Sequence, residues 1–206
     1  MRLIQLFIFT LGLAPLLAQA NLIINGDFEA DTVSGTNAGS GYEYVTSASL
    51  TGWTVNDVTS PIRGAVLFNS LYGQGVGSGA NSLQIEDYGD SINQVISTVI
   101  GQEYELLFDI SAYSSPGSAS VEVGIDANTF LVAGSYPSYV TQSILFTASA
   151  TNTTISFTQV NSGGRYPHLD NISVTETAAS VPAAPVWLLL AAGLIGVNRA
   201  TQRNKP

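Results

Sequence analysis

Short segments in which apolar and polar residues alternate strictly constrain the fold of this chain more than any other feature. The clearest segment spans residues 103–111, and its apolar positions are Tyr104, Leu106, Phe108 and Ile110. Because successive side chains of a β-strand point to opposite faces, this pattern predicts a strand with one buried face and one solvated face. The same period of two recurs in residues 121–125, 140–147 and 154–158.

Further strands are predicted where short apolar runs lie between polar or glycine-rich turns, in residues 22–24, 50–55, 65–68, 82–85, 91–99 and 172–174. Trp53 lies in one of these runs and is expected to point into the core, with a sugar-stacking role as the alternative. The polar residues 31–49 are expected to form a long surface loop. About nine to eleven short strands without a helical pattern predict an all-β fold, an antiparallel β-sandwich of the jelly-roll type.

The N-terminal residues 1–20 have the three parts of a signal peptide. Arg2 precedes an apolar run from Leu3 to Leu17, which ends at the small-residue sequence Ala18-Gln19-Ala20. A run of this length is short for a membrane core of ~30 Å. Export with cleavage is therefore expected, and a retained membrane anchor is the alternative.

A second apolar block lies near the C-terminus, after a linker in residues 177–185. Residues 186–198 are predicted to be the core of a membrane helix, because the run lacks the polar face that a helix of a globular core would need. The basic tail, residues 199–206, is then expected to face the cytoplasm. The remaining residues 21–176 are long enough for one β-sandwich domain with a single core.

The exported part is strongly acidic. All 15 Asp and Glu residues lie between Asn21 and Ser180, but only Arg63 and Arg165 of the six Lys and Arg residues do, which leaves a net charge of −13. Such a charge repels nucleic acid and anionic lipid and favours divalent cations. The chain has no cysteine, so disulfides and cysteine metal sites are excluded.

Two carboxylates near the ends of this domain are candidates for a calcium site. Asp170 shares parity with Ile172 and Val174 in the last predicted strand, so it is expected to point inward or toward the rim, where it needs a partner. Oxygen ligands for Ca²⁺ are plentiful and cationic side chains are few, so we expect an ion shared by Glu29 and Asp170. The alternative is that these carboxylates are solvated or bound by backbone amides.

Several segments together resemble a known family. They are Asn21–Glu29 (Asn-Leu-Ile-Ile-Asn-Gly-Asp-Phe-Glu), Leu50–Thr54, Ile92–Ile96, Gly101–Tyr104, Phe108–Asp109 and Leu169–Val174. They are similar to the galactose-binding-like jelly rolls, especially the DUF642 and choice-of-anchor families of secreted surface proteins. The resemblance implies a structural Ca²⁺ near the chain ends, at positions matched by Glu29 and Asp170, and binding of cell-wall or extracellular polysaccharide.

The C-terminal region resembles the PEP-CTERM sorting signal of Gram-negative bacteria, which consists of a proline-containing motif, a short membrane helix and a basic end. The matching positions are Val181, Pro182, Pro185 and Arg199. This chain has Val-Pro-Ala-Ala-Pro where the typical motif is Val-Pro-Glu-Pro. The resemblance implies processing by an exosortase, with an inner-membrane intermediate and a final place at the cell surface or in secreted matrix.

Enzyme chemistry finds little support in the sequence. His168 is the only histidine, and neither a Gly-x-Ser-x-Gly motif nor a histidine metal cluster accompanies it. We therefore expect His168 to be structural. Glu86, Asp87 and Asp90 cluster in one turn and leave open a glycoside-hydrolase pair, although such acids are more often simply solvated.

Tyrosines in or beside loops are the stronger candidates for ligand contact, because each offers a sugar a flat apolar face and a hydroxyl. The selected positions are Tyr42, Tyr88, Tyr136 and Tyr166. The chain is thus expected to be a non-catalytic surface or matrix protein that associates with carbohydrate. The alternative is a purely structural matrix protein with no defined glycan ligand.

Overall fold

A computed structural model describes residues 19–35, 37–59, 63–72, 77–113 and 117–177. Its strands are β1 Tyr42–Val45, β2 Thr54–Asn56, β3 Ala65–Asn69, β4 Asn81–Ile85, β5 Ser91–Ser97, β6 Glu103–Ala112, β7 Ser118–Ile125, β8 Asn128–Ser135, β9 Val140–Thr147, β10 Asn152–Gln159 and β11 Pro167–Glu176. Two short 3-10 helices, η1 Ala38–Ser40 and η2 Ser70–Tyr72, complete the described elements. The all-β prediction is confirmed.

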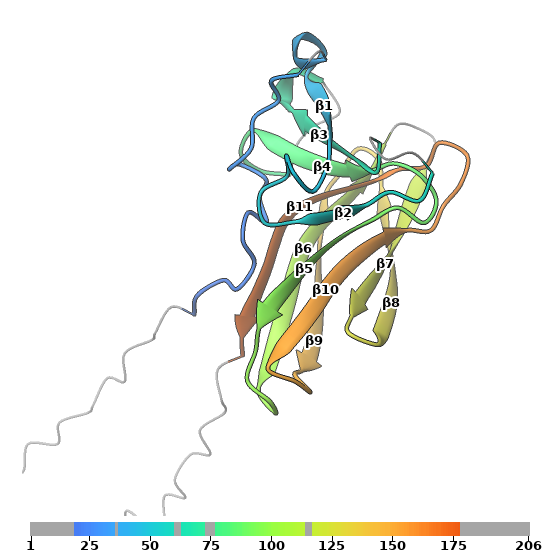
Figure 1. The fold of residues 1–206 in the computed structure, drawn as a ribbon. Coiled ribbons are helices and arrows are strands. Elements are labelled where there is room, and N and C mark those ends of the chain that lie inside the picture. The colour runs from blue at the N-terminus through green and yellow to red at the C-terminus, as the bar shows by residue number, and fades with distance from the viewer. Residues whose placement is uncertain (1–18, 36, 60–62, 73–76, 114–116, 178–206) are drawn as a thin grey trace, which may run out of the picture.

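The strands form two antiparallel sheets that pack face to face (Figure 1). One sheet has six strands in the order β1-β3-β4-β11-β6-β9, and the other has five in the order β2-β5-β10-β7-β8. Strands far apart in the sequence are neighbours in both sheets, as β4 and β11 are. The predicted antiparallel β-sandwich is therefore the observed architecture.

The core lies between the two sheets and is built from the inward positions of the alternating strands. The inward residues of β6 are those that the period of two predicts, and Tyr104, Leu106, Phe108 and Ile110 are all buried. Trp53 is also buried, and its ring centroid lies 6.3 Å from that of Phe157 on β10. Its core role is thus observed, although it lies just before β2 rather than within a strand.

The start of the chain closes the sandwich against the last strand. The Leu22 N–H donates to the carbonyl of Val174 at 2.8 Å, and the Ile172 N–H donates to the carbonyl of Gly26 at the same distance. Phe28 has a φ of +59° and is fully buried, so a strained left-handed turn delivers this ring to the core. Residues 21–28 and β11 therefore belong to one closed core.

Two local predictions were wrong, and one strand was missed. Residues 22–24 form no strand, and Ile23 and Ile24 lie in a bend, because the first segment contacts β11 through isolated hydrogen bonds. The predicted loop of residues 31–49 contains β1, whose polar and aromatic residues gave no apolar alternation. The edge strand β8 was not predicted, because its mostly exposed residues carry no inward signal.

The predicted sorting and membrane segments lie almost entirely outside the described residues. Outside lie residues 1–18 of the predicted signal peptide (residues 1–20), the C-terminal helix in residues 186–198, and the motif positions Val181, Pro182, Pro185 and Arg199. Within the described ranges, no helix has the length and apolar character needed to cross a membrane.

Candidate functional site

The outer face of the six-stranded sheet carries a groove with a volume of ≈ 210 Å³ that is lined by aromatic side chains. The aromatic lining consists of Tyr42, Tyr44, Phe68, Tyr72, Tyr113 and Tyr166. These residues come from β1, β3 and η2 and from the ends of β6 and β11. The groove thus crosses five neighbouring strands, roughly 19 Å at ~4.8 Å per strand.

Strand register explains why these rings share one face. Tyr42 pairs with Phe68 across β1 and β3, and paired residues of antiparallel strands point to the same side of a sheet. The outward positions alternate with the buried core positions of the same strands. Tyr113 and Tyr166 continue the same face beyond the strand ends, where the Tyr113 N–H donates to the carbonyl of Tyr166 at 2.9 Å.

The aromatic rings contact one another and form a continuous wall. Tyr42 lies edge-on to Tyr72 with 5.6 Å between ring centroids, and Tyr72 lies 4.4 Å from Phe68. The hydroxyls of Tyr72 and Tyr113 are 3.2 Å apart, and Tyr113 meets Tyr166 edge-on at 5.8 Å. Because each ring is held by its neighbours, little side-chain entropy remains to be lost when a ligand binds.

Gln84 and Glu86 form the polar floor of the groove, and His168 is buried beneath it. Hydrogen bonds link the three side chains. Gln84 Nε2 donates to Glu86 Oε1 at 2.5 Å, and Gln84 Oε1 lies 2.6 Å from His168 Nε2. Since a carboxylate can only accept, the Gln84 amide nitrogen faces Glu86 and its oxygen faces His168. Burial lowers the pKa of His168 to about 3, so the neutral ring donates its Nε2 hydrogen to Gln84.

The charge of Glu86 extends over the groove. Burial raises the pKa of Glu86, and the nearby Asp87 raises it further. Burial also raises the pKa of the hydroxyls of Tyr44 and Tyr166, and the Glu86 carboxylate adds to both shifts. Arg63 opposes this charge at the β1 edge, where its guanidinium lies 5.1 Å from the centre of the Tyr44 ring.

A second hollow adjoins the groove. Its volume is ≈ 340 Å³, and it is lined by Glu86 and Tyr166, which it shares with the groove, and by Asp87, Tyr88 and the loop of residues 161–164. Glu86 and Tyr166 therefore stand where the two depressions meet.

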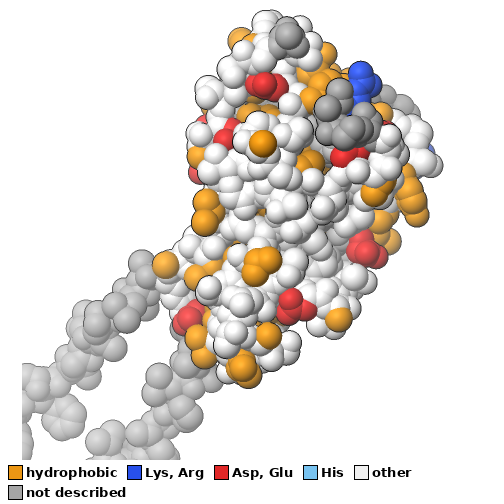
Figure 2. Space-filling view, in the orientation of Figure 1, with side chains coloured by type: hydrophobic (Ala, Val, Ile, Leu, Met, Phe, Trp, Pro, Cys, Tyr) orange, Lys and Arg blue, Asp and Glu red, His pale blue; other side chains and the backbone are white. Residues whose placement is uncertain are grey.

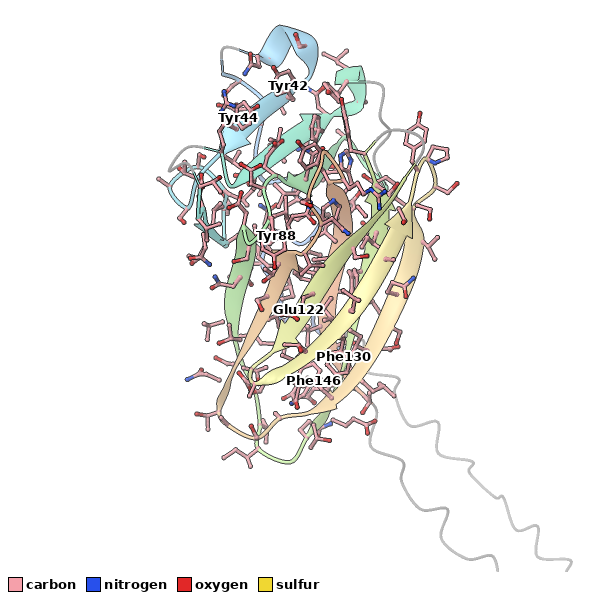
Figure 3. The ribbon with its side chains drawn as sticks, turned by 90° about the vertical axis from the view of Figure 1, so that its right-hand side faces the viewer. Tyr42, Tyr44, Tyr88, Glu122, Phe130 and Phe146 are labelled. Carbon is pink, nitrogen blue, oxygen red and sulfur yellow. The ribbon has the colours of Figure 1, made fainter. Side chains whose placement is uncertain are left out.

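The predicted tyrosines fall in three places. Tyr42 and Tyr166 line the groove, and Tyr88, which is 65 % exposed, lines the adjoining hollow. Tyr136 is 37 % exposed and lines neither depression. Figure 3 shows Tyr42 and Tyr44 on β1, at the opposite end of the molecule from Phe130 and Phe146.

Other groove residues were not selected from the sequence. Phe68 had the spacing of a core residue, and Tyr113 follows a long buried strand. Gln84 and His168 are both buried beneath the groove, and the His168 ring stacks on Phe68 at 5.1 Å. Only the strand register shows that these positions face outward together, and no local motif could have revealed it.

Glu29 and Asp170, the predicted calcium ligands, both bind the same short loop, residues 77–81. Glu29 Oε1 accepts hydrogen bonds from the backbone amides of Ala80 and Asn81, each at 2.7 Å. Asp170 Oδ2 accepts from the Ser78 amide at 2.8 Å, and Asp170 Oδ1 accepts from the amide of Asn171 at 2.7 Å. The two carboxylates thus join the start of the chain and its last strand to one loop.

Glycine allows this close approach. A Cβ on Gly77 would lie 2.7 Å from Asp170 Oδ2, and one on Gly79, whose φ is +63°, would overlap the Glu29 carboxylate. The glycines of this loop therefore leave room for the two carboxylates.

The parity argument for Asp170 was wrong, because a β-bulge interrupts β11 between Asp170 and Ser173. Asp170 pairs with Asp109 on the outer side of β6, whereas Ile172 points into the core. Asp170 is nevertheless fully buried, because the loop of residues 77–81 covers it.

Calcium gains no direct support from these contacts. The partners found for both carboxylates are backbone amides, as in the alternative stated above, and amide hydrogens point toward the oxygens that a cation would use. Within the described part of the chain, no cluster of three or more His, Cys, Asp or Glu side chains is placed to hold a metal ion. Glu29 and Asp170 do not by themselves make a calcium site, and the ion stays a prediction.

Comparison with known proteins identifies the family. The family model described as "Protein of unknown function (DUF642)" matches residues 21–175. The chain belongs to the DUF642 family. No curated protein matches its sequence.

Solved structures similar to this DUF642 domain include carbohydrate-binding modules. The module TmCBM61, solved in complex with β-1,4-galactotriose, has a TM-score of 0.50 and 12 % identity, and the match covers 77 % of this chain and 99 % of that one. The tandem CBM22 domain of Paenibacillus barcinonensis Xyn10C has a TM-score of 0.49 and 11 % identity, with coverage of 83 % and 49 %. At such low identity the similarity to TmCBM61 establishes the jelly-roll fold of the DUF642 domain and not its ligand.

Proposed function

We propose that this DUF642 domain is a non-catalytic carbohydrate-binding module that uses the aromatic groove. The observation that supports the proposal is the groove itself, in which six aromatic rings surround a hydrogen-bonded polar floor. Sugar rings have apolar faces that pack on aromatic side chains and hydroxyls that need hydrogen-bond partners. The groove offers both, on a face that the sandwich keeps rigid.

The polar floor has the character of a binding surface rather than a reaction centre. His168 is neutral and fully buried, and its Nε2 hydrogen is committed to Gln84. Glu86 is held by the amide of Gln84 and is positioned to accept hydrogen bonds from a ligand. A carboxylate and an amide that hold each other in place suit recognition of sugar hydroxyls.

Removing a groove tyrosine is expected to weaken glycan binding. The proposal predicts that residues 21–176, which contain the whole described core, bind at least one glycan on an array. Tyr42→Ala and Tyr166→Ala should each weaken that binding by about tenfold or more, because each removes a ring that packs against the sugar. Isothermal titration with the glycan found on the array measures the change.

Tyr136→Ala is the matched control, since it removes an exposed tyrosine that lines neither depression. Its affinity should equal that of the unaltered domain, and thermal melts should show all three variants folded. A domain that binds no glycan at millimolar concentration would contradict the proposal and leave the purely structural matrix role.

Export and sorting belong to the same proposal. The signal-peptide features of residues 1–20 and the PEP-CTERM-like motif at Val181, Pro182 and Pro185 support a place for the binding module at the cell surface or in secreted matrix. Export followed by processing by an exosortase-type enzyme remains our proposal for how the domain reaches its extracellular glycan.

Calcium is a separate prediction that a thermal melt can test. If an ion joins Glu29 and Asp170, EDTA should lower the melting temperature, because a ligand that binds only the folded state stabilises it. Glu29→Gln should then melt at the same temperature with and without EDTA. Equal melting temperatures for the unaltered domain in calcium and in EDTA would exclude the ion.

A further inference from the structure

We infer that the groove selects neutral glycans over uronic-acid polymers, and that Glu86 is the residue that sets this preference. The inference rests on the proposed carbohydrate-binding function and adds the chemical class of the ligand. It follows from the position of one carboxylate relative to both depressions, and from the small number of cations that could offset it.

Glu86 occupies the junction of the binding surface. It lines both the groove and the adjoining hollow, as Tyr166 does, so a glycan chain that extends from one depression into the other passes this carboxylate. Asp87 lines the hollow beside it. A uronate unit at the junction would therefore bring its own carboxylate next to one or two others.

The hydrogen bonds around Glu86 keep its charge in place. Gln84 Nε2 donates to one carboxylate oxygen, and the Gln84 oxygen is in turn held by His168. The Gln84 side-chain amide therefore cannot flip to offer its N–H groups to a ligand carboxylate unless its hydrogen bond with His168 breaks. Glu86 is held as an acceptor that suits sugar hydroxyls.

Neighbouring acids reinforce this charge. Asp87 Oδ2 accepts from the Thr59 hydroxyl at 2.8 Å, and the buried Asp90 accepts from the amides of Val58 and Asp87 at 2.9 Å each. These contacts fix both acids close to the hollow. The charge of Glu86 also raises the pKa of Tyr44, Tyr72 and Tyr166, after burial as the first cause, so its field reaches across the groove.

The opposing positive charge is limited. Residues 21–177 contain two Lys or Arg residues, Arg63 and Arg165. The Arg63 guanidinium stacks over the ring of Tyr44 at one edge of the groove, and its charge lowers the pKa of Glu86 by less than the nearby Asp87 raises it. Arg165 is exposed and lies in the sequence between Gly164 and Tyr166, which line the hollow. On the face drawn in Figure 2, acidic side chains likewise outnumber basic ones. Glu86, Asp87 and Asp90 outnumber these two cations, so the balance of fixed charge around the junction is negative.

Polymers that differ only in charge test the inference. Polygalacturonate and alginate are each compared, by affinity electrophoresis at low salt, with the same polymer after its carboxyl groups have been reduced to hydroxymethyl groups. The unaltered domain should bind the reduced form of at least one pair about tenfold more tightly than the acidic form. Raising the salt concentration to 0.5 M should reduce this difference in affinity, because exposed charges are then screened.

Two variants assign the effect to one residue. Glu86→Gln keeps an oxygen that can accept from Gln84 and removes the charge. The difference in affinity between the reduced and the acidic polymer should then fall to about threefold or less. Glu122→Gln makes the same charge change on β7 of the other sheet and should leave the difference unchanged. Figure 3 shows Glu122 well away from Tyr42 and Tyr44.

The outcomes separate this inference from the proposed function. Equal or tighter binding of the acidic polymer would overturn neutral selectivity while the binding function stands. A neutral preference that Glu86→Gln does not reduce would overturn the role of Glu86. Failure to bind any of these polymers or any glycan on the array would contradict the proposed function itself.

Discussion

Gly26→Ala is expected to destabilise the domain more than any surface substitution, by at least about 3 kcal/mol of unfolding free energy. A Cβ on Gly26 would overlap the carbonyl oxygen of Ile172 and lie 2.8 Å from its carbonyl carbon. This obstacle is backbone and cannot rotate away. Relief requires the first segment to move off β11, which breaks the hydrogen bond from the Ile172 amide to the Gly26 carbonyl.

Urea denaturation followed by tryptophan fluorescence measures this loss, because Trp53 is buried against the same first segment. Its Nε1 donates to the carbonyl of Asn25 at 3.0 Å, and its ring lies 6.1 Å from Phe28. Gly39→Ala is the control, since a Cβ there meets nothing within 4 Å, and its stability should change by less than ~0.5 kcal/mol. Similar midpoints for both variants would show that the chain start does not close the sandwich.

Most of the sandwich could be predicted from the sequence, because its strands bury one face each. The period of two in β6 identifies both the strand and its four inward side chains, and the chain ends were expected to meet. The two strands that the sequence did not predict share one cause. β1 and β8 lie at sheet edges, where residues are half-buried or exposed and the alternation that marks a core strand is absent.

The groove was predicted only in part, for a different reason. Tyr42 and Tyr166 were selected because tyrosine suits sugars, but Tyr136 has the same chemistry and lies elsewhere. What makes the site is the pairing of β1 with β3 and of β11 with β4 and β6, which places distant residues on one face. The register between strands distant in sequence depends on tertiary structure. A bulge of one residue, such as the one after Asp170, moves the side chains that follow it to the opposite face of the sheet.

Asp170 is expected to make the domain less stable as the pH rises from about 4 to about 6. Burial raises the pKa of Asp170 from its ordinary 3.8 to about 6, and the charge of Asp109 adds to this, although the amides of Ser78 and Asn171 oppose it. The folded state therefore holds a proton that the unfolded chain releases across this range, and stability falls as that proton is lost. The full effect is about 3 kcal/mol and is complete above the folded pKa.

Asp170→Asn isolates this effect, because the variant carries no proton to lose. Its amide oxygen can accept from one of the two backbone N–H groups, and the other is left without its acceptor at every pH, a constant cost of about 1 to 3 kcal/mol. The stability of Asp170→Asn relative to the unaltered domain should therefore rise by about 2.5 kcal/mol between pH 4 and pH 7. Urea denaturation in EDTA at both pH values measures it without interference from metal.

Glu122→Gln again serves as control, since it removes one carboxylate of the other sheet and should show no such rise. Glu86 and Asp90 also have pKa values raised by burial, but they contribute equally to both proteins and cancel in the comparison. The prediction is wrong if the unfolding free energies of Asp170→Asn and the unaltered domain differ by the same amount at pH 4 and pH 7. That result would show that other groups fully offset the cost of burying the Asp170 charge. In that case the amides of residues 78 and 171, or a cation bound beside them, would stabilise its charge completely.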